Sequence, residues 1–328
     1  MNIKVGIVGL GTISKTHLNT LKSIKDVELV AVCDVDKQKV KDAQKEFGGE
    51  PYFDFNEMLK EQALDAILIC VPQKVRYEPI ESAVRKGLAI FCEKPPAFDM
   101  ETARKVERVI KKSKVINSVG FMYRYSKITD MAKELIKGHT ISMMRSTFLC
   151  SAGLNPNLPG WFLLKEHSGG PLLDQAIHFI DVERYILGDI SRLQTFSNNL
   201  VLPKSSKVTI EDSHSVNLCF TSGVIGNHLH SWIHRGWVAR VEIYGENLHL
   251  CVDYVNKAIF GKVSDTEIKK ETPDDDCYTT ELNQFFAAIQ KKDQSLIRSS
   301  YSDAVKSLAT VLTANKSIQT EKTEEIGG

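Results

Sequence analysis

The sequence predicts an α/β protein with two domains: an N-terminal doubly wound parallel sheet and a C-terminal α+β domain built on a mostly antiparallel open sheet. Three observations lead to this prediction. Short apolar runs alternate with helical patterns up to about residue 121, as in repeated strand-helix units. Beyond that point most segments are strand-like and joined by turns, which favours antiparallel pairing. The 328 residues suffice for two cores, and we place the domains at residues 1–121 and 122–328.

The first strand and helix are typical of a phosphate-binding turn. A β-branched run over residues 5–8 stops at Gly9, and a helical pattern follows over Thr16–Ile24. The free N–H groups and the positive dipole end of that helix face whatever lies over the turn. Gly9 permits the tight turn and Gly11 permits the close approach of a pyrophosphate, whereas the third position, usually a glycine, holds Ser14.

The second strand, Val27–Cys33, ends at Asp34, at the distance expected of a ribose-binding acid. A Gly-x-Gly turn alone can be an ordinary loop, but strand, turn, helix, strand and acid occur here in the order of a dinucleotide site. Asp34 would bind the ribose hydroxyls and repel a 2′-phosphate, which favours NAD, while Lys37 and Lys39 leave NADP as an option. We therefore predict a Rossmann domain. Its expected cofactor contacts are Gly9, Gly11, Thr12, Ile13, Asp34, Val71, Pro72 and Glu93.

Further strand-helix units extend this parallel sheet. Helices are expected over Lys37–Phe47, Asn56–Lys60, Tyr77–Lys86 and Asp99–Lys112, and strands over Ala66–Val71, Leu88–Cys92 and Val115–Val119. The carboxyl ends of parallel strands form the ligand crevice, so Gly9, Asp34, Pro72 and Lys94 should converge there.

Lys94 follows a buried strand and precedes two prolines that restrict the backbone. A lysine at this edge could donate a hydrogen bond to a substrate oxygen, or act as a base if burial and nearby cations lower its pKa. The alternative is a surface lysine in a loop. The topology favours the functional role because it directs this loop toward the crevice.

A second candidate site lies in the segment Ser168–Asp181. Asp174 and His178 are four residues apart on an apolar helical stripe and share one helix face. Histidine is suited to take a proton from a hydroxyl while hydride leaves the same carbon, and a neighbouring carboxylate can orient it. The alternative is a structural or solvated pair, and Asp181 could equally be the partner of the histidine.

The second domain combines helices with turn-linked strands and ends in a polar tail, Glu321–Gly328, that we expect to be frayed. Helices are expected over Lys127–Lys137, Pro171–Leu187, Thr279–Gln290 and Ser302–Ser317, and strands over Ser142–Cys150, Leu193–Leu202, His214–Phe220, Val224–Trp232, Arg240–Tyr244, Leu248–Tyr254 and Ala258–Val263. We interpret His228 and His230 as sheet-face residues rather than metal ligands, and expect them, with Trp232 and Trp237, at an oligomer contact.

The composition excludes several classes of partner. The 42 Lys and Arg residues nearly balance the 41 Asp and Glu residues, so no bulk field attracts nucleic acid or an anionic membrane. The sequence shows no leader pattern and no apolar run long enough for a membrane span, and we expect a cytoplasmic protein without a metal. The seven cysteines include no Cys-x-x-Cys pair and are expected to be free, buried thiols.

Three separated motifs resemble those of the glucose-fructose oxidoreductase, inositol dehydrogenase and rhizopine catabolism family, Gfo/Idh/MocA. They are Gly9–Gly11 with Asp34, the Glu93–Pro95 motif, and Gly169–Gly170 followed by Asp174 and His178. The resemblance covers nearly the full chain. It implies that Lys94 and His178 form the catalytic pair with Asp174 beside them, and that Arg124 and Trp161 bind substrate.

The same resemblance implies an NAD(P)-dependent oxidoreductase that interconverts a secondary alcohol and a ketone on a sugar, inositol or related polyol. Some relatives use NAD transiently as glycosidases or lyases, and a non-catalytic NAD-binding sensor is a further alternative. The family's open second sheet implies a homodimer or homotetramer. Two departures concern the substrate pocket: Arg76 stands where many relatives carry histidine, and Phe162 replaces a frequent cation.

Overall fold

The computed structural model describes residues 2–202 and 204–327, and the chain divides into two compact units. The first comprises Met1–Tyr125 and Asp276–Val305, and the second comprises Ser126–Asp275 and Lys306–Gly328. The segment Asp276–Val305, which the sequence-based division assigns to the second domain, therefore groups with the first unit.

The first unit contains a six-stranded sheet in the order β3-β2-β1-β4-β5-β6, and every pairing in it is parallel. Its strands are β1 (Ile3–Val8), β2 (Val27–Cys33), β3 (Glu50–Tyr52), β4 (Ala66–Ile69), β5 (Ala89–Cys92) and β6 (Asn117–Val119). Every residue of β4 and β5 is buried, as continuous apolar runs require in a sheet covered on both faces. The predicted doubly wound parallel sheet is confirmed, although β3 was not anticipated.

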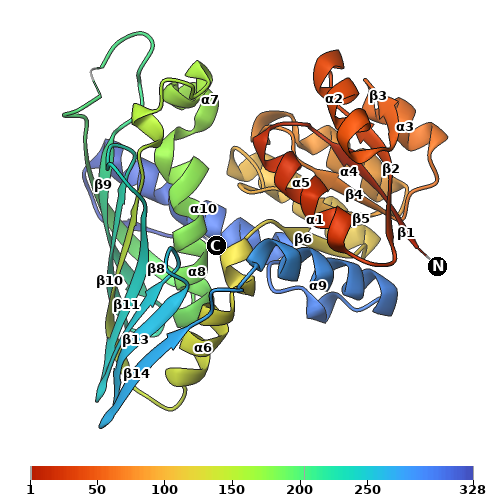
Figure 1. Ribbon diagram of the computed structural model, residues 1–328. Coiled ribbons are helices and arrows are strands. Elements are labelled where there is room, and N and C mark those ends of the chain that lie inside the picture. The colour runs from red at the N-terminus through yellow and green to blue at the C-terminus, as the bar shows by residue number, and fades with distance from the viewer. Residues whose placement is uncertain (1, 203, 328) are drawn as a thin grey trace. The chain divides into compact units, whose positions relative to one another are not determined.

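Aspartates cap three of the five helices that the first chain segment contributes to this unit. The five helices are α1 (Thr12–Ser23), α2 (Lys37–Phe47), α3 (Phe55–Glu61), α4 (Tyr77–Arg85) and α5 (Met100–Ser113), and all of them are labelled in Figure 1. The side chains of Asp36, Asp54 and Asp99 accept backbone N–H groups at the first turns of α2, α3 and α5. In α1 the residue at the cap position is Gly11, which offers no side chain, so that helix presents its N-terminal N–H groups openly.

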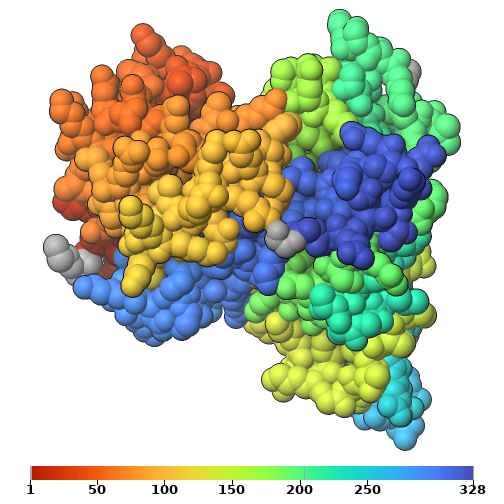
Figure 2. All heavy atoms as spheres, turned by 180° about the vertical axis from the view of Figure 1, so that it is seen from behind, coloured from red at the N-terminus to blue at the C-terminus, as the bar shows by residue number. Residues whose placement is uncertain are grey.

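Helix α9 (Cys277–Lys291) completes the first unit although it comes late in the chain. Its Leu282, Phe285 and Phe286 belong to the same apolar cluster as the strand residues of the parallel sheet. The rings of Phe285 and Phe91 make an edge contact with centroids 5.7 Å apart. Figures 1 and 2 both show the blue helix α9 directly against the N-terminal part of the chain. Burial of the apolar face of α9 against the parallel sheet explains why Asp276–Val305 belongs to the first unit.

The second unit contains a nine-stranded sheet in the order β14-β13-β12-β11-β7-β10-β9-β8-β15. Its strands are β7 (Ile141–Leu149), β8 (Ile190–Asn198), β9 (Ser213–Phe220), β10 (Ile225–Ser231), β11 (Val238–Gly245), β12 (Leu248–Asp253), β13 (Ala258–Val263), β14 (Thr266–Glu271) and β15 (Glu324–Glu325). Among the described strands of this second sheet only β7 and β10 pair in parallel, so the mostly antiparallel prediction is confirmed.

The prediction of a frayed C-terminal tail is wrong for its described part. Glu324 and Glu325 pair with β8, and the N–H of Ile326 donates to the carbonyl of Ser191 at 2.8 Å. Ser317 also donates its hydroxyl to the carbonyl of Lys322. Pairing along a strand edge satisfies backbone groups regardless of side-chain polarity, so a polar tail can be ordered. Gly328 lies outside the described residues.

Helices α6 (Lys127–Leu135), α8 (Ile177–Leu187) and most of α10 (Tyr301–Thr320) cover one face of this sheet, as Figure 1 shows. The strands alternate buried and exposed residues accordingly. The opposite face carries exposed apolar side chains, namely Met143, Phe196, Ile225 and Phe260. Among the described residues no helix is long and apolar enough to cross a membrane.

Candidate functional site

The glycine turn has the geometry of a pyrophosphate seat. Gly9 has a φ of +93°, and a Cβ there would lie 2.6 Å from the backbone nitrogen of Val71, so no larger residue fits. At Gly11 a Cβ would meet nothing within 4 Å, which leaves open space above the start of α1. Ser14 is buried and donates its hydroxyl to the carbonyl of Gly11 at 2.6 Å. The residue that departs from the glycine fingerprint therefore braces the turn.

Asp34 is held against this turn as the sequence predicts. One carboxylate oxygen accepts the N–H of Leu10 at 2.7 Å and the other accepts the N–H of Asp36 at 2.9 Å. The two neighbouring lysines interact elsewhere: Lys37 lies over the ring of Phe53, and Lys39 lies 3.9 Å from Asp36. A helix N-terminus, an open glycine and an oriented acid together fit a dinucleotide.

Lys94 lies two residues beyond the carboxyl end of β5, the strand that pairs in parallel with β4. Residues 88–97 are all buried except Lys94, which is partly exposed. Its backbone N–H donates to the Glu93 carboxylate at 3.0 Å. The peptide bond that joins Lys94 to Pro95 is cis. The fold thus presents one side chain of this loop and buries the rest.

The Glu93 carboxylate is buried in a charged cluster. It lies 2.7 Å from Nε2 of His17, a fully buried residue of α1 that sequence reasoning missed because nothing in the spacing links it to Glu93. Burial opposes ionisation of Glu93, but His17, Lys94 and Arg76 outweigh it and lower its pKa. One carboxylate oxygen of Glu93 contacts His17 and the other accepts the backbone N–H of Lys94. A contact between Glu93 and the cofactor stays a prediction.

Arg76 is not the pocket residue that its place in the sequence implied. Its side chain is buried, and its guanidinium donates to the carbonyls of Val71, Glu93 and Pro95. All these carbonyls belong to the first unit: Val71 follows β4, and Glu93 and Pro95 flank Lys94.

Arg124 is likewise buried and paired inside the first unit. Its guanidinium lies 2.5 Å from the carboxylate of Asp303 and donates to the carbonyl of Arg298 at 2.6 Å. Arg298 in turn donates to the carbonyl of Arg124. This reciprocal contact joins the end of the first chain segment to the returning one, and substrate binding by Arg124 stays a prediction.

In the second unit the Asp174–His178 segment begins with a π-helical turn, Leu172–Ala176, and continues as α8. Such turns are frequent at functional sites. Within residues 171–184 only Asp174, Gln175 and His178 are partly exposed, and all the others are buried. Asp181, the other acid in the segment, is buried and accepts the hydroxyl of Ser307 at 2.6 Å.

The two glycines before this helix are sterically required. Gly169 has a φ of +78°, and a Cβ there would lie 2.2 Å from a methyl of Leu173. Gly170 has a φ of +81° and donates its N–H to the hydroxyl of Ser168 at 3.0 Å. These contacts fix where the π-turn starts, and with it the side on which Asp174 lies.

Gln175 and the 161–162 pair border the same helix. The Gln175 side-chain oxygen accepts the indole N–H of Trp232 at 2.5 Å and the thiol of Cys150 at 3.1 Å. Phe162 packs against the apolar cluster that contains Cys150 and Trp232, and its ring stacks on the partly exposed Trp161 at 3.8 Å. Phe162 therefore contributes to apolar packing in this cluster. Substrate binding by Trp161 stays a prediction.

The expectation of His228, His230 and Trp232 at an oligomer contact is wrong. All three are buried: His228 and His230 lie on β10, and Trp232 follows that strand and packs in the apolar cluster with Cys150. His228 lies 2.9 Å from Glu183, and His230 bonds the carbonyl of Phe148 at 2.8 Å. Burial lowers the pKa of His230 well below its usual value. No group of three potential ligands able to hold a metal ion occurs among the described residues.

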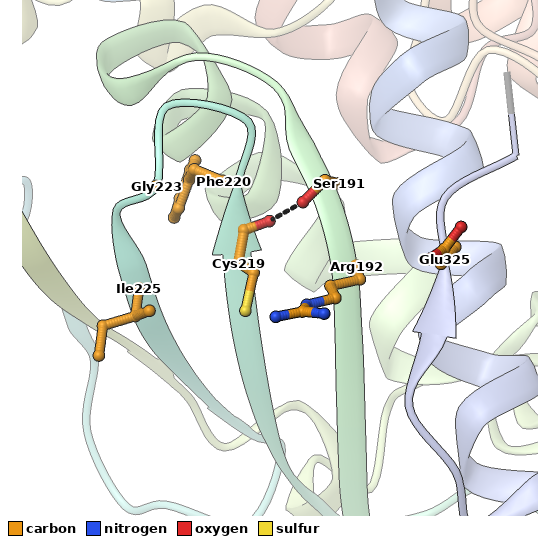
Figure 3. A pocket seen from close by; sticks show the side chains of 7 residues that line it. All are labelled: Ser191, Arg192, Cys219, Phe220, Gly223, Ile225 and Glu325. Atoms are coloured by element: carbon orange, nitrogen blue, oxygen red, sulfur yellow. Dashed lines mark hydrogen bonds between the residues drawn. The ribbon is translucent and has the colours of Figure 1, made fainter.

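A shallow hollow of about 360 Å³ lies elsewhere on the second unit. Figure 3 shows Arg192 on β8 reaching toward Cys219 on β9, with Ser191 bonded to the Cys219 carbonyl at 3.0 Å. The remaining lining residues are Phe220, Gly223, Ile225 and Glu325. None of the predicted site residues lines it, and we do not assign it to the chemistry.

Comparisons with known proteins agree with this geometry. Residues 3–121 match a model described as an oxidoreductase family with an NAD-binding Rossmann fold, and residues 131–250 match the GFO/IDH/MocA C-terminal domain. A myo-inositol 2-dehydrogenase of Thermotoga maritima is 27% identical over 259 residues, which cover 78% of this chain and 76% of that protein. An inositol 2-dehydrogenase of Rhizobium meliloti is 27% identical over 331 residues, which cover 97% of each.

Solved structures show the same fold. A levoglucosan dehydrogenase in complex with NADH superposes with a TM-score of 0.90 at 20% identity over 100% of both chains. A myo-inositol 2-dehydrogenase from Lactobacillus plantarum gives a TM-score of 0.87 at 24% identity, also over 100% of both chains.

Proposed function

Because the chain belongs to the Gfo/Idh/MocA family of NAD-binding oxidoreductases, we propose that it interconverts a secondary alcohol and a ketone. The proposed substrate is a sugar, an inositol or a related polyol. The names of the inositol dehydrogenases described above support this substrate class.

The observation that carries the proposal is the exposure pattern of the two candidate segments. Residues 88–97 are buried except at Lys94, and residues 171–184 are buried except at Asp174, Gln175 and His178. Lys94, Asp174 and His178, to which we assign roles in the reaction, are therefore accessible, whereas Gln175 is bonded to Trp232 and Cys150. Two buried segments that leave these ionisable groups accessible fit a site for a polar ligand.

We assign the roles by the chemistry of each group. The bound nicotinamide supplies a hydride acceptor for the carbinol carbon, or a hydride donor in the reverse direction. His178 takes the hydroxyl proton, and Asp174 orients its imidazole and favours the charged form. Lys94 donates a hydrogen bond to the same oxygen and stabilises its developing negative charge. Asp174 is preferred to Asp181 as the orienting acid because it shares the accessible face of His178.

NAD is the proposed cofactor rather than NADP. Asp34 presents a carboxylate at the glycine turn, and a 2′-phosphate there would meet that negative charge. The variant Asp34→Ser removes the charge, and we expect it to weaken NADH binding and strengthen NADPH binding. Fluorescence titration of both cofactors measures this, and an unchanged preference would argue against Asp34 as the selecting residue.

A homodimer or homotetramer formed through the open face of the nine-stranded sheet is also proposed. That face carries Met143, Phe196, Ile225 and Phe260 as exposed apolar residues, which burial against a second copy would remove from water. Light scattering coupled to gel filtration tests this, with Ile225→Arg expected to lower the measured mass. A monomeric unmodified protein would refute it.

The cytoplasm is the proposed location, since all seven cysteines are free thiols, as is usual in a reducing compartment. Fractionation of the producing cells tests this proposal. Recovery of the protein outside the cytoplasmic fraction would refute it.

The test of the activity begins with titration of the purified protein with NADH and NADPH. An absorbance screen at the NADH band then follows inositols, glucosides and levoglucosan in the presence of NAD. Tight NADH binding with net reduction of NAD by a polyol supports the proposal. Cofactor binding without net reduction by any of them would favour a hydrolase or lyase with internal oxidation, or a sensor.

A further inference from the structure

The loop that carries Lys94 is tied to the neighbouring strand end by one buried side chain. Arg76 is only 4% exposed, and its Nη1 donates to the carbonyls of both Glu93 and Pro95, the residues on either side of Lys94. Its Nε and Nη2 donate to the carbonyl of Val71 at 3.0 and 2.6 Å. A single guanidinium thus spans three carbonyls that belong to the ends of β4 and β5.

Few side chains can make this contact. Arginine spreads five N–H donors over a rigid plane, whereas the three donors of lysine share one nitrogen and histidine has at most two ring N–H groups. Neither substitute reproduces the arrangement in which Nη1 serves Glu93 and Pro95 while Nε and Nη2 serve Val71. The carbonyls of Glu93 and Pro95 are buried with Arg76, so we expect the loop to move when they lose this donor.

The charge of Arg76 is also balanced locally. Burying a guanidinium is costly unless an opposite charge and hydrogen-bond acceptors accompany it. The Glu93 carboxylate supplies that charge, since Arg76 is among the groups that lower its pKa, and Glu93 accepts the Lys94 N–H at 3.0 Å. Three polar contacts therefore converge on the backbone at Lys94: two flanking carbonyls and its own amide.

We infer that Arg76 is a positioning residue that holds the backbone on both sides of Lys94 and so aims the Lys94 ammonium at the substrate oxygen. The inference rests on the proposed role of Lys94 in the reaction. Arg76 itself touches neither substrate nor cofactor in this scheme.

A test that needs no substrate follows the position of Lys94 directly. Reductive methylation with ¹³C labels the lysine ammonium groups, and loss of one NMR signal in Lys94→Arg assigns Lys94. The variants Arg76→Gln and Arg76→His, which add no lysine signal, are compared with Arg85→Ala, which removes an exposed arginine at the end of α4 that pairs with Glu81. Thermal unfolding of each variant confirms that it is folded, and Arg76→Gln serves if Arg76→His is not.

The expected result is a shifted or broadened Lys94 signal in the Arg76 variants, with the signals of distant lysines such as Lys4 and Lys316 in place. Arg85→Ala is expected to leave the Lys94 signal unchanged. A Lys94 signal that coincides in unmodified protein and folded Arg76 variants would overturn the inference.

Kinetics on the polyol found in the screen separate this inference from the proposed function. Arg76→Lys is expected to lower kcat by about 10- to 100-fold with little change in NADH affinity, the cost of a small misplacement of a reacting group. In a Lys94→Ala background the same change should have almost no further effect. Fully additive losses would overturn the inference. Undiminished turnover of Lys94→Ala would instead overturn the proposed role of Lys94 in the reaction. The NMR comparison would then still test whether Arg76 holds Lys94 in position.

Discussion

The two sheets of this protein present their candidate residues by different means. The parallel sheet is buried on both faces, and Lys94 extends from a loop at the end of β5 whose backbone is held by Arg76 and Glu93. The nine-stranded sheet is covered on one face only, and His178 lies on a helix that packs on that face. In the first unit the position of Lys94 follows from hydrogen bonds to the backbone of its loop. In the second unit the position of His178 follows from the burial of one side of its helix.

The difference shows how each unit handles charge. Around Lys94 the ionic groups are buried and bonded to the main chain or to one another, and Lys94 carries the accessible ammonium of this loop. Around His178 the helix buries both apolar residues and the charged Asp181, Glu183 and Arg184, which pair with other side chains. Only Asp174, Gln175 and His178 are partly exposed within residues 171–184. Substitutions should therefore act mainly on chemistry at His178, but on both loop position and chemistry near Lys94.

The largest expected effect is on turnover in His178→Ala. Loss of a general base costs about 10²- to 10⁴-fold in rate, while NADH binding should be nearly unchanged because the glycine turn is intact. Steady-state kinetics and fluorescence titration measure the two quantities. His167→Ala is the control, since His167 is exposed and pairs with Glu166. Wild-type turnover in His178→Ala would contradict the role of His178 as the residue that takes the hydroxyl proton.

The contrast between the sheets is sharpened by two phenylalanines. Phe91 of β5 is fully buried, and Phe91→Ala should lower the free energy of unfolding by about 3–5 kcal/mol. Phe260 of β13 is 41% exposed on the open face, and Phe260→Ala should change it by less than about 1 kcal/mol in the monomer. Denaturant unfolding at low protein concentration measures both. Equal losses would mean that the open face is covered in solution.

A smaller effect is expected from Gly169→Ala at the start of the π-turn. The new methyl would meet Leu173, and the residue would keep a positive φ, so we expect a loss of about 1–3 kcal/mol and a lower kcat. Gly138→Ala is the matched control because Gly138 has the same φ of +78° and open space around its Cβ. If the two variants lose equal stability and keep full turnover, the clash does not set the position of Asp174.

The smallest effect concerns acid stability and Glu211 in the second unit. Burial opposes ionisation of Glu211, but His214 and the Lys165 ammonium at 2.5 Å outweigh it and lower its pKa to about 2. A carboxylate whose pKa falls on folding adds stability above its unfolded pKa of about 4.5, and this stability is lost as pH falls toward 2.

Glu211→Gln should therefore be less stable at pH 7, by about 1–2 kcal/mol, and should lose less stability than the unmodified protein between about pH 4.5 and 2. Unfolding free energies across that range give the slope. Glu166→Gln, which removes an exposed carboxylate, should leave the slope unchanged. An unaltered slope in Glu211→Gln would show that the pair with Lys165 contributes nothing.

The sequence alone determined the features that depend on neighbours along the chain. The glycine turn, the position of Asp34, the apolar runs of β4 and β5 and the spacing of Asp174 and His178 are local patterns with a local physical cause. The same holds for the aspartate cap of α5. These predictions carried the fold class and the cofactor, because strand burial and helix termini leave periodic traces in a sequence.

The tertiary structure alone decided which distant residues meet. Nothing in the spacing pairs His17 with Glu93, directs Arg76 to the carbonyls around Lys94, or returns α9 to the first core. The order of the polar tail and the burial of His228 beneath a helix also depend on a strand edge and a sheet face assembled from remote segments. Hydrogen bonds and apolar burial act on distance in space, and the chain path that creates those distances exists only in the folded protein.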